Sequence, residues 1–179
     1  MNFPILNTNR LFLRQIQQED IGNVLKGLSD SNVIQYYGIS YKTLEETQQQ
    51  IDWYKDLEKN KTGIYWAICS LDNTVFYGIG GFNQLSMEYK KAEIGFWLLP
   101  NFWNNGFMQE AFPVICSFGF EKLDLNRIEG FVEKENINCR KSIEKMGFTL
   151  EGIMRECEIK NDQFLDVCIY SKLKKENCK

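Results

Sequence analysis

Residues 101–111, which read NFWNNGFMQEA, have the composition of a loop that could bind a phosphate. They follow the short apolar and aromatic run 92–99, which predicts a β-strand ending at Pro100, because proline donates no hydrogen bond to a neighbouring strand. Apolar side chains recur at helical spacing after Gly106, so a helix is predicted to begin there. A strand that turns into a helix in this way presents free N–H groups and the positive end of a helix dipole. The segment is therefore a candidate anion site, with a plain strand–helix connection as the alternative.

The side chains that could transfer protons are limited by the absence of histidine. A Ser-His-Asp or Cys-His nucleophile is excluded, so proton transfer must use Glu, Asp, Cys, Tyr, Ser or Lys. The six cysteines form no C-x-x-C pair, and most stand in apolar stretches, where cysteine behaves as a small hydrophobic residue. We therefore expect reduced thiols in a cytoplasmic protein, and no bound metal.

Length and composition are those of an ordinary globular chain. The 179 residues are 44% hydrophobic and 25% charged, which predicts one domain, residues 1–179, with a sizeable core. The formal net charge of −3 gives no indication of a nucleic-acid partner. No apolar run approaches the length of a membrane span, and residues 1–10 lack the apolar core of a signal peptide. We therefore expect neither nucleic acid nor a membrane among the partners.

Hydrophobic periodicity predicts seven strands and four helices. The strands are residues 11–15, 64–70, 75–82, 92–99, 127–132, 148–158 and 164–173. The helices are residues 20–29, 43–60, 106–122 and 138–146, and Thr43 with Glu46 forms a capping-box pattern at the start of the second. Pro113 conflicts with the third helix, since it should free the carbonyl of Gln109 and kink the axis. The order of elements predicts an α+β (mixed α/β) fold in which helices flank one mixed sheet.

Two further segments, residues 136–148 (NINCRKSIEKMGF) and 150–155 (LEGIMR), extend the pattern. The ordered set AEIGFWLLP, W-x-x-G-F-M-x-E-A, N-x-x-C, EKMGF and EG-x-x-R resembles the GNAT family of acetyl-CoA-dependent N-acetyltransferases. This set and the opening TNRLFLRQIQQED are similar to the branch that acetylates ribosomal-protein N-termini, from about Asn7 to Leu173. The resemblance implies the GNAT fold: a mixed, mostly antiparallel sheet of about seven strands flanked by about four helices. Two central strands splay apart, and the acetyl-pantetheine arm lies between them.

The resemblance also implies which residues hold acetyl-CoA. Backbone N–H groups of the loop would bind the pyrophosphate, and those at the end of the central strand would polarise the thioester carbonyl. The loop residues are Asn104, Asn105, Gly106, Phe107 and Met108, and the strand residues are Phe96, Trp97 and Leu98. Trp103 stands where the family usually has a basic or glutamine residue, and its alternative role is simple burial. Met108 is bulkier than the small residue usual at its position.

Two residues of the later segments would complete the cofactor site. Asn136 matches the family asparagine that binds the pantetheine arm, and its alternative role is a helix N-cap. Lys141 could meet the 3′-phosphate, and its alternative is an exposed helix position.

Three residues are candidates for proton transfer. Glu158 matches the general base of the ribosomal branch, and Glu93, a lone carboxylate in the apolar central strand, is its rival because a buried charge is costly without a purpose. Cys139 stands where that branch has a serine implied as the general acid for the leaving thiolate. The ordinary thiol pKa of about 8.5 would suit that role, while the alternative is core packing on one helical face with Ile143 and Met146.

The activity implied is acetyl transfer from acetyl-CoA to a primary amine, in the leading case the α-amino group of a protein N-terminus. The alternatives are a small amine, a polyamine or an aminoglycoside-like drug as acceptor, or a catalytically silent acyl-CoA-binding module. We expect the acceptor pocket to be built by residues 30–41, with Tyr36 and Tyr37, and by the hairpin 160–164. The sequence leaves both a monomer and a homodimer open.

Overall fold

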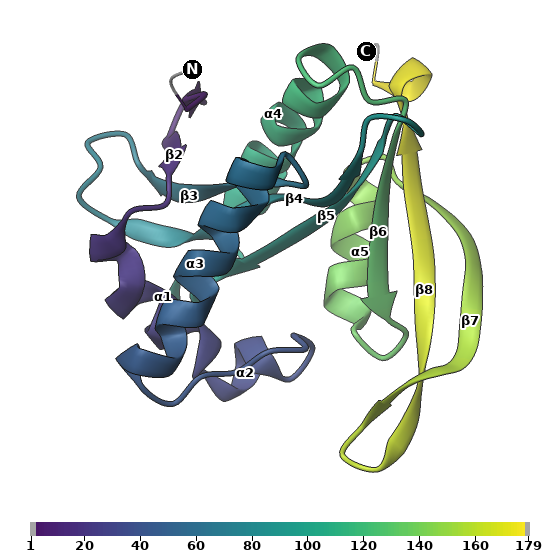
Figure 1. The fold of residues 1–179 in the computed structure, drawn as a ribbon. Helices are drawn as coiled ribbons and strands as arrows, with labels where there is room; N and C mark the ends of the chain where they lie inside the picture. The colour runs from purple at the N-terminus through teal and green to yellow at the C-terminus, as the bar shows by residue number, and fades with distance from the viewer. Residues whose placement is uncertain (1–2, 178–179) are drawn as a thin grey trace.

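The computed structural model describes residues 3–177, and its centre is one eight-stranded sheet (Figure 1). The strand order is β1-β2-β3-β4-β5-β6-β8-β7. The strands are β1 (Leu6–Asn7), β2 (Leu11–Gln15), β3 (Ile64–Ser70), β4 (Phe76–Ser86), β5 (Lys91–Leu98), β6 (Arg127–Glu133), β7 (Thr149–Lys160) and β8 (Gln163–Leu173). The helices are α1 (Ile21–Leu28), α2 (Ser31–Ile34), α3 (Leu44–Asn60), α4 (Phe107–Glu121) and α5 (Ile137–Lys145).

The expected α+β fold with a mostly antiparallel mixed sheet is confirmed. All seven predicted strands are present, and β4 continues to Ser86, four residues beyond its predicted end. Among the strands and α-helices, two short elements were missed: β1, which pairs Leu6 with Leu13, and the single-turn helix α2. Both are too short to carry a hydrophobic period, so periodicity could not find them.

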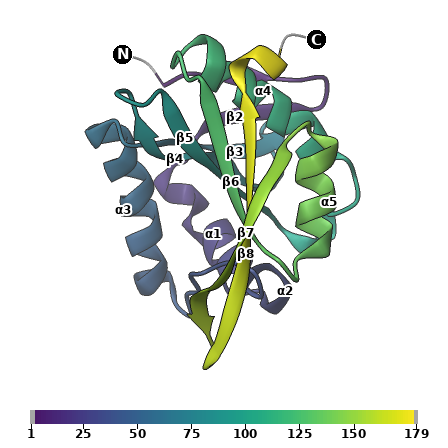
Figure 2. The same cartoon turned by 90° about the vertical axis from the view of Figure 1, so that its right-hand side faces the viewer.

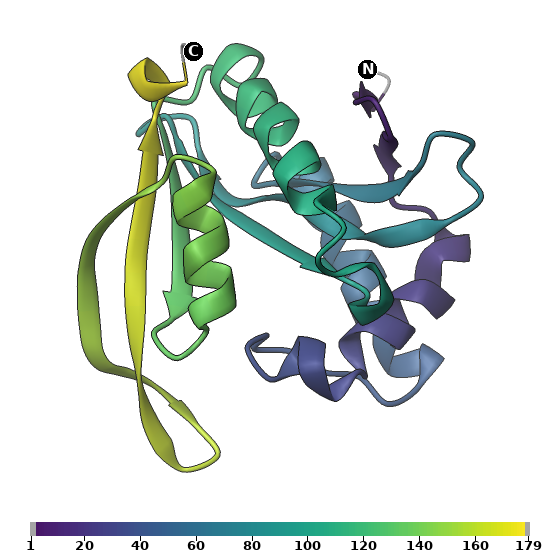
Figure 3. The same ribbon diagram turned by 180° about the vertical axis from the view of Figure 1, so that it is seen from behind.

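The sheet divides between β5 and β6, its only parallel neighbours in the described chain. Their pairing covers three positions, from Lys91 with Arg127 to Glu93 with Glu129. Beyond these positions the two strands diverge, as Figures 1 and 3 show. From Ile94 to Leu98, β5 is therefore paired with β4 on one side and with no strand on the other.

Helices cover both faces of the sheet. Helices α1, α2 and α3 pack on one face, around Tyr54, Ala67 and Trp97, whereas α4 packs on the other, around Phe82 and Phe112. Figure 2 shows α3 and α5 on opposite sides of the sheet. Along β5, Trp97 and Gly95 therefore face the α1–α3 side, and the alternate residues face α4 and α5. Glu93 has the same parity as Trp97 and shares its face.

The structure shows what becomes of the predicted capping box of α3 and of the proline within α4. The Thr43 hydroxyl accepts a hydrogen bond from the Glu46 N–H at 3.2 Å, as predicted, but the Glu46 carboxylate returns to the N–H of Lys42 rather than to that of Thr43. Pro113 lies inside α4 without ending it. The carbonyl that the proline leaves unpaired belongs to the exposed Gln109, where water can reach it.

Candidate active site

The loop before α4 has the backbone geometry of an anion cradle. Asn104 and Gly106 both have positive φ, 61° and 76°, so the chain turns sharply into the helix. Within residues 3–177, none of the N–H groups from Asn104 to Met108 donates a hydrogen bond. Five consecutive donors at the positive end of a fifteen-residue helix are thus available to an anion.

The side chains of Met108 and Trp103, at the two ends of the cradle, have different surroundings. Met108, whose bulk stood out in the sequence, is 7% exposed and packs into the core below α4. Trp103 is 41% exposed, so simple burial does not describe it. Its indole N–H donates to the carbonyl of Leu98 at 2.8 Å, which ties the loop to the end of β5.

The free edge of β5 decides which N–H groups face the opening between the two halves of the sheet. Leu99 donates its N–H to Tyr77, which belongs to β4. Because N–H groups alternate along a strand, those of Trp97 and Gly95 also point to β4, and those of Phe96 and Leu98 point into the opening. The prediction for Trp97 is therefore corrected: its N–H faces β4, and its side chain is buried against Gly27 of α1.

A cavity of about 300 Å³, which we call the central cavity, passes through this opening. Its lining includes Gln50 and Trp53 of α3 on one face of the sheet, and Cys139 and Ile143 of α5 on the other. Its other lining residues are Tyr37, Gly38, Ile39, Tyr65, Asn83, Glu93, Ile94, Gly95, Phe96, Gly130, Phe131 and Val132. Within the described chain, Glu93 is the only charged residue of this lining.

Glu93 is a half-buried carboxylate in the middle of the molecule. Its carboxylate accepts a hydrogen bond from the Gln84 amide at 3.1 Å. Burial raises the pKa of Glu93, a contact with the Asn83 amide opposes the shift, and the negative charges of Glu129 and Glu158 add to it. Glu93 is therefore a stronger base than an exposed glutamate.

Tyr65 and Asn83 form the polar wall beside this carboxylate. The Asn83 amide donates to the Tyr65 hydroxyl at 2.9 Å. A Cβ on Gly95 would lie 2.6 Å from that hydroxyl oxygen, so only glycine leaves room for it. Burial raises the pKa of Tyr65 well above its ordinary range, which keeps the phenol protonated.

Cys139 lies in the central cavity, on the first turn of α5. Burial raises the pKa of its thiol to about 11, so the thiol stays protonated at neutral pH. Asn136 is the N-cap of this helix, and its side-chain oxygen accepts the Cys139 N–H at 3.1 Å. The N-cap role is thus present, and the Asn136 amide N–H₂ donates no hydrogen bond within residues 3–177.

Two predicted site residues lie apart from the central cavity. Glu158 is exposed on β7, opposite Leu165 of β8, and does not line the cavity. Its charge still reaches Glu93, because it contributes to the raised pKa there. Lys141 is exposed on α5, and no carboxylate of residues 3–177 forms an ion pair with it.

The predicted acceptor segments are only partly brought together. Tyr37 lines the central cavity, but the hydroxyl of Tyr36 points to the Glu135 carbonyl at 3.5 Å. The hairpin reaches across instead with Lys160, which pairs with Glu133 at 2.7 Å and donates to the carbonyl of Gln35. One lysine thus links α2, β6 and the β7–β8 hairpin.

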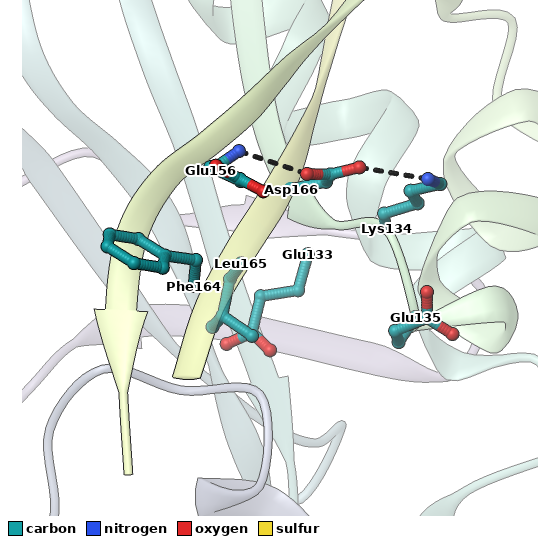
Figure 4. A pocket seen from close by; sticks show the side chains of 7 residues that line it. All are labelled: Glu133, Lys134, Glu135, Glu156, Phe164, Leu165 and Asp166. Carbon is teal, nitrogen blue, oxygen red and sulfur yellow. Dashed lines mark hydrogen bonds and ion pairs between the residues drawn. The ribbon is translucent and has the colours of Figure 1, made fainter. Parts of the chain in front are cut away.

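A second cavity, of about 240 Å³, lies beside this bridge and is rich in carboxylates (Figure 4). It is lined by Glu133, Lys134, Glu135, Glu156, Phe164, Leu165 and Asp166. Lys134 pairs with Asp166 at 2.9 Å, and the same carboxylate accepts the Glu156 N–H at 3.0 Å. Sequence reasoning missed this cavity because its residues come from the end of β6 and the turn after it, from β7 and from β8, which meet only in the folded sheet.

Sequence reasoning also missed the aromatic and amide lining of the central cavity. Gln50 and Trp53 are three residues apart on α3, and the amphipathic pattern of that helix was the available signal. The pattern showed which face is buried, but not that a cavity lies beneath it. Within residues 3–177, no three His, Cys, Asp or Glu side chains are grouped as a metal site requires. No helix of the same residues is long and apolar enough to span a membrane.

Comparison with known proteins defines the class. The family model described as "Acetyltransferase (GNAT) domain" matches residues 10–149. The chain is 35% identical over 173 residues to the uncharacterized N-acetyltransferase YoaA of Bacillus subtilis, covering 96% of this chain and 98% of that protein. It is 27% identical over 96 residues to the ribosomal-protein-serine acetyltransferase of Escherichia coli, covering 54% of each.

Among solved structures, RimL, a ribosomal alpha-N-protein acetyltransferase in complex with coenzyme A, superposes with a TM-score of 0.85. The two sequences are 21% identical, and the match covers 95% of this chain and 98% of that one. The splayed mixed sheet and the cradle before α4 therefore belong to a chain that the family model identifies as an acetyltransferase. The chain belongs to the GNAT family and is an acetyl-CoA-dependent N-acetyltransferase.

Proposed function

We propose that this chain transfers the acetyl group of acetyl-CoA directly to the α-amino group of a protein or peptide N-terminus. The observation that carries the proposal is the position of Glu93, the only charged residue among those described that line the central cavity. One carboxylate among aromatic and amide side chains suits an acceptor with one ammonium group and uncharged surroundings. The relative in Escherichia coli that acts on ribosomal-protein serine supports the same acceptor class.

The cofactor would be held by the residues around the opening. The free N–H groups from Asn104 to Met108 suit its pyrophosphate, and the unpaired amide of Asn136 suits the polar atoms of the pantetheine arm. Lys141 remains the proposed contact of the 3′-phosphate. The N–H groups of Phe96 and Leu98 face the opening, where they would stabilise the negative charge that develops on the oxygen of a bound thioester.

Proton transfer in this proposal is assigned to Glu93. Its raised pKa makes it a stronger base than an exposed glutamate, and its place in the central cavity brings it to the amine. An α-amine has a pKa near 8, so a useful fraction is already neutral at pH 7. Glu158, the first choice from the sequence, is exposed and takes second place as the base.

Cys139 would act at the leaving sulfur as a hydrogen-bond donor. Its thiol pKa of about 11 exceeds the ordinary thiol value of about 8.5, so complete proton transfer to the leaving thiolate is uphill. A protonated thiol can still donate to the developing thiolate. The proposal therefore needs a hydrogen bond from Cys139, rather than its proton.

A polyamine is the second candidate acceptor, and the carboxylate-rich cavity of Figure 4 favours it. That cavity holds four carboxylates against one lysine, a balance that attracts a polycation. Two of the four, Glu133 and Asp166, already pair with Lys160 and Lys134, which reduces the attraction.

An acceptor screen tests the proposal. Release of free coenzyme A thiol is measured with peptides that begin with Ser, Ala or Met, and with spermidine, free amino acids and an aminoglycoside. The proposal expects turnover with at least one peptide and its loss in Glu93→Gln. Turnover with spermidine alone would identify a polyamine, rather than a peptide N-terminus, as the acceptor. Acetyl-CoA binding without thiol release from any acceptor would favour a silent binding module.

A further inference from the structure

The cofactor loop carries no cation of its own. The chain from Ala92 to Glu121 contains neither lysine nor arginine. A cradle for a pyrophosphate that carries two negative charges would therefore depend on N–H groups and a helix dipole alone. A cation reaches the loop from near the start of the sequence: Arg10 contacts both Asn105 and Phe107.

Arg10, just before β2, contacts both the loop and the start of α4. Its Nε pairs with the Glu110 carboxylate at 2.6 Å, and its Nη1 donates to the carbonyl of Asn105 at 3.1 Å. The guanidinium also lies over the ring of Phe107, 4.9 Å from the centroid. The remaining nitrogen, Nη2, lies beside Gly106, 3.5 Å from where a Cβ would stand.

Glu110 anchors this arginine from the first turns of α4. Its carboxylate accepts the Arg10 N–H at 2.8 Å and the Thr8 hydroxyl at 2.5 Å. The residues before β2 are thereby bonded to the start of α4. The ion pair also neutralises a carboxylate that would otherwise oppose an anion at this helix end.

The bond to Asn105 has a consequence for the peptide that follows it. A peptide group is planar and trans, so its C=O and N–H point in opposite directions. Because Arg10 holds the carbonyl of Asn105, the N–H of Gly106 points away from the guanidinium. That N–H is one of the five free donors of the cradle.

We propose that Arg10 is a positioning residue of the cofactor site: it fixes the peptide between Asn105 and Gly106 for the pyrophosphate, and it neutralises the Glu110 carboxylate that would otherwise repel an anion at this end of α4. This inference rests on the proposed assignment of the loop to acetyl-CoA. It predicts that Arg10 serves the diphosphate of the donor and has no part in the chemistry of the acetyl group.

The test compares two acetyl donors in the full-length protein. Acetyl-CoA carries the diphosphate, and acetyl-pantetheine lacks it. We expect Arg10→Ala to raise the KM for acetyl-CoA about tenfold with little change in kcat, and to leave kcat/KM for acetyl-pantetheine unchanged. The increase in KM should shrink at high salt, where the wild-type protein loses the same electrostatic attraction.

Two further variants serve as controls. One tests whether loss of any surface cation has the same effect, and the other tests whether a positive charge at position 10 is enough. Lys90→Ala removes an exposed cation paired with Asp124 at 2.6 Å, away from the loop, and should leave both donors unaffected. Arg10→Lys keeps the charge but loses the planar fork that spans Glu110 and Asn105, so the KM should stay raised.

Three results would overturn the inference. They are full recovery in Arg10→Lys, equal losses with both donors in Arg10→Ala, and an unchanged KM for acetyl-CoA in Arg10→Ala. Failure of the proposed function is distinguishable from these, because then wild-type protein would not bind acetyl-CoA or a Gly106 variant would bind it normally.

Discussion

The indole N–H of Trp103 donates to the carbonyl of Leu98 at 2.8 Å, and this bond joins the two backbone segments of the proposed cofactor site. Leu98 ends β5, where N–H groups face the opening, and Trp103 directly precedes the anion cradle. In the proposed site, this one side chain would thus help to set the distance between the end of β5 and the anion cradle.

Trp103→Phe removes that hydrogen bond and keeps an aromatic ring. A neutral hydrogen bond is worth about 1 kcal/mol, so we expect kcat/KM for acetyl-CoA to fall about fivefold in steady-state assays. Trp66→Phe is the matched control, because Trp66 donates a similar 2.8 Å bond to the Pro4 carbonyl away from the loop. That control should lower the melting temperature without changing kcat/KM. An unchanged kcat/KM in Trp103→Phe would show that the hydrogen bond between Trp103 and Leu98 does not help to position acetyl-CoA.

Gly106→Ala tests the cradle directly. The φ of 76° is strained for a residue with a Cβ, and any shift to relieve it moves the N–H groups that follow. We expect acetyl-CoA affinity, measured by calorimetry, to fall about tenfold or more, with the fold retained because Gly106 is not in the core. Gly22→Ala, in a helix where a Cβ meets nothing within 4 Å, is the control. Equal affinity in Gly106→Ala and wild type would place the cradle elsewhere.

Glu93→Gln should lower turnover by about 100-fold while acetyl-CoA affinity stays level. In the wild type, kcat/KM should rise with pH through the Glu93 pKa, which burial places above the ordinary glutamate value. Only the rise from the amine, near pH 8, should remain in Glu93→Gln. Glu158→Gln is the comparison. A larger loss of turnover in Glu158→Gln than in Glu93→Gln would assign the role of general base to Glu158.

Glu93→Gln should also stabilise the fold at neutral pH. Because the folded-state pKa of Glu93 is raised, folding takes up a proton between the unfolded and folded pKa values, and stability falls as pH rises through that window. Glu93→Gln should therefore have a higher melting temperature than wild type at pH 7, and the difference should diminish below about pH 4. A lower melting temperature at pH 7 would show that the carboxylate is stabilised by its surroundings.

Cys139→Ser should remain active, and Cys139→Ala should lose turnover by less than Glu93→Gln does. A hydroxyl can replace the thiol as hydrogen-bond donor, whereas a methyl group cannot. Alkylation checks the protonation state: at pH 7.5 the exposed Cys157 should react with iodoacetamide well before Cys139, whose thiol pKa is about 11. Rapid alkylation of Cys139 in a Cys157→Ser background would contradict a half-buried, protonated thiol.

The sequence predicted most of the sheet because strand and helix periods are local. Residues 64–70 and 92–99 are apolar runs bounded by turn residues, and both became strands at nearly those bounds. Gly106 likewise marked the loop, because a sharp turn into a helix needs a residue that tolerates positive φ. The divergence of β5 and β6 was expected only through the family resemblance, since no local period encodes it.

The sequence by itself determined the strand and helix order, the turn at Gly106 and the family, because each depends on neighbouring residues or on motifs in order. Only the tertiary structure decided that Glu93 lines the central cavity while Glu158 is exposed, and that the N–H groups of Phe96 and Leu98, rather than that of Trp97, face the opening. It also brought Arg10 to Asn105, 95 positions along the chain. Such relationships follow from strand register and from which edge of a strand is left unpaired, and both are fixed only when distant segments pack together.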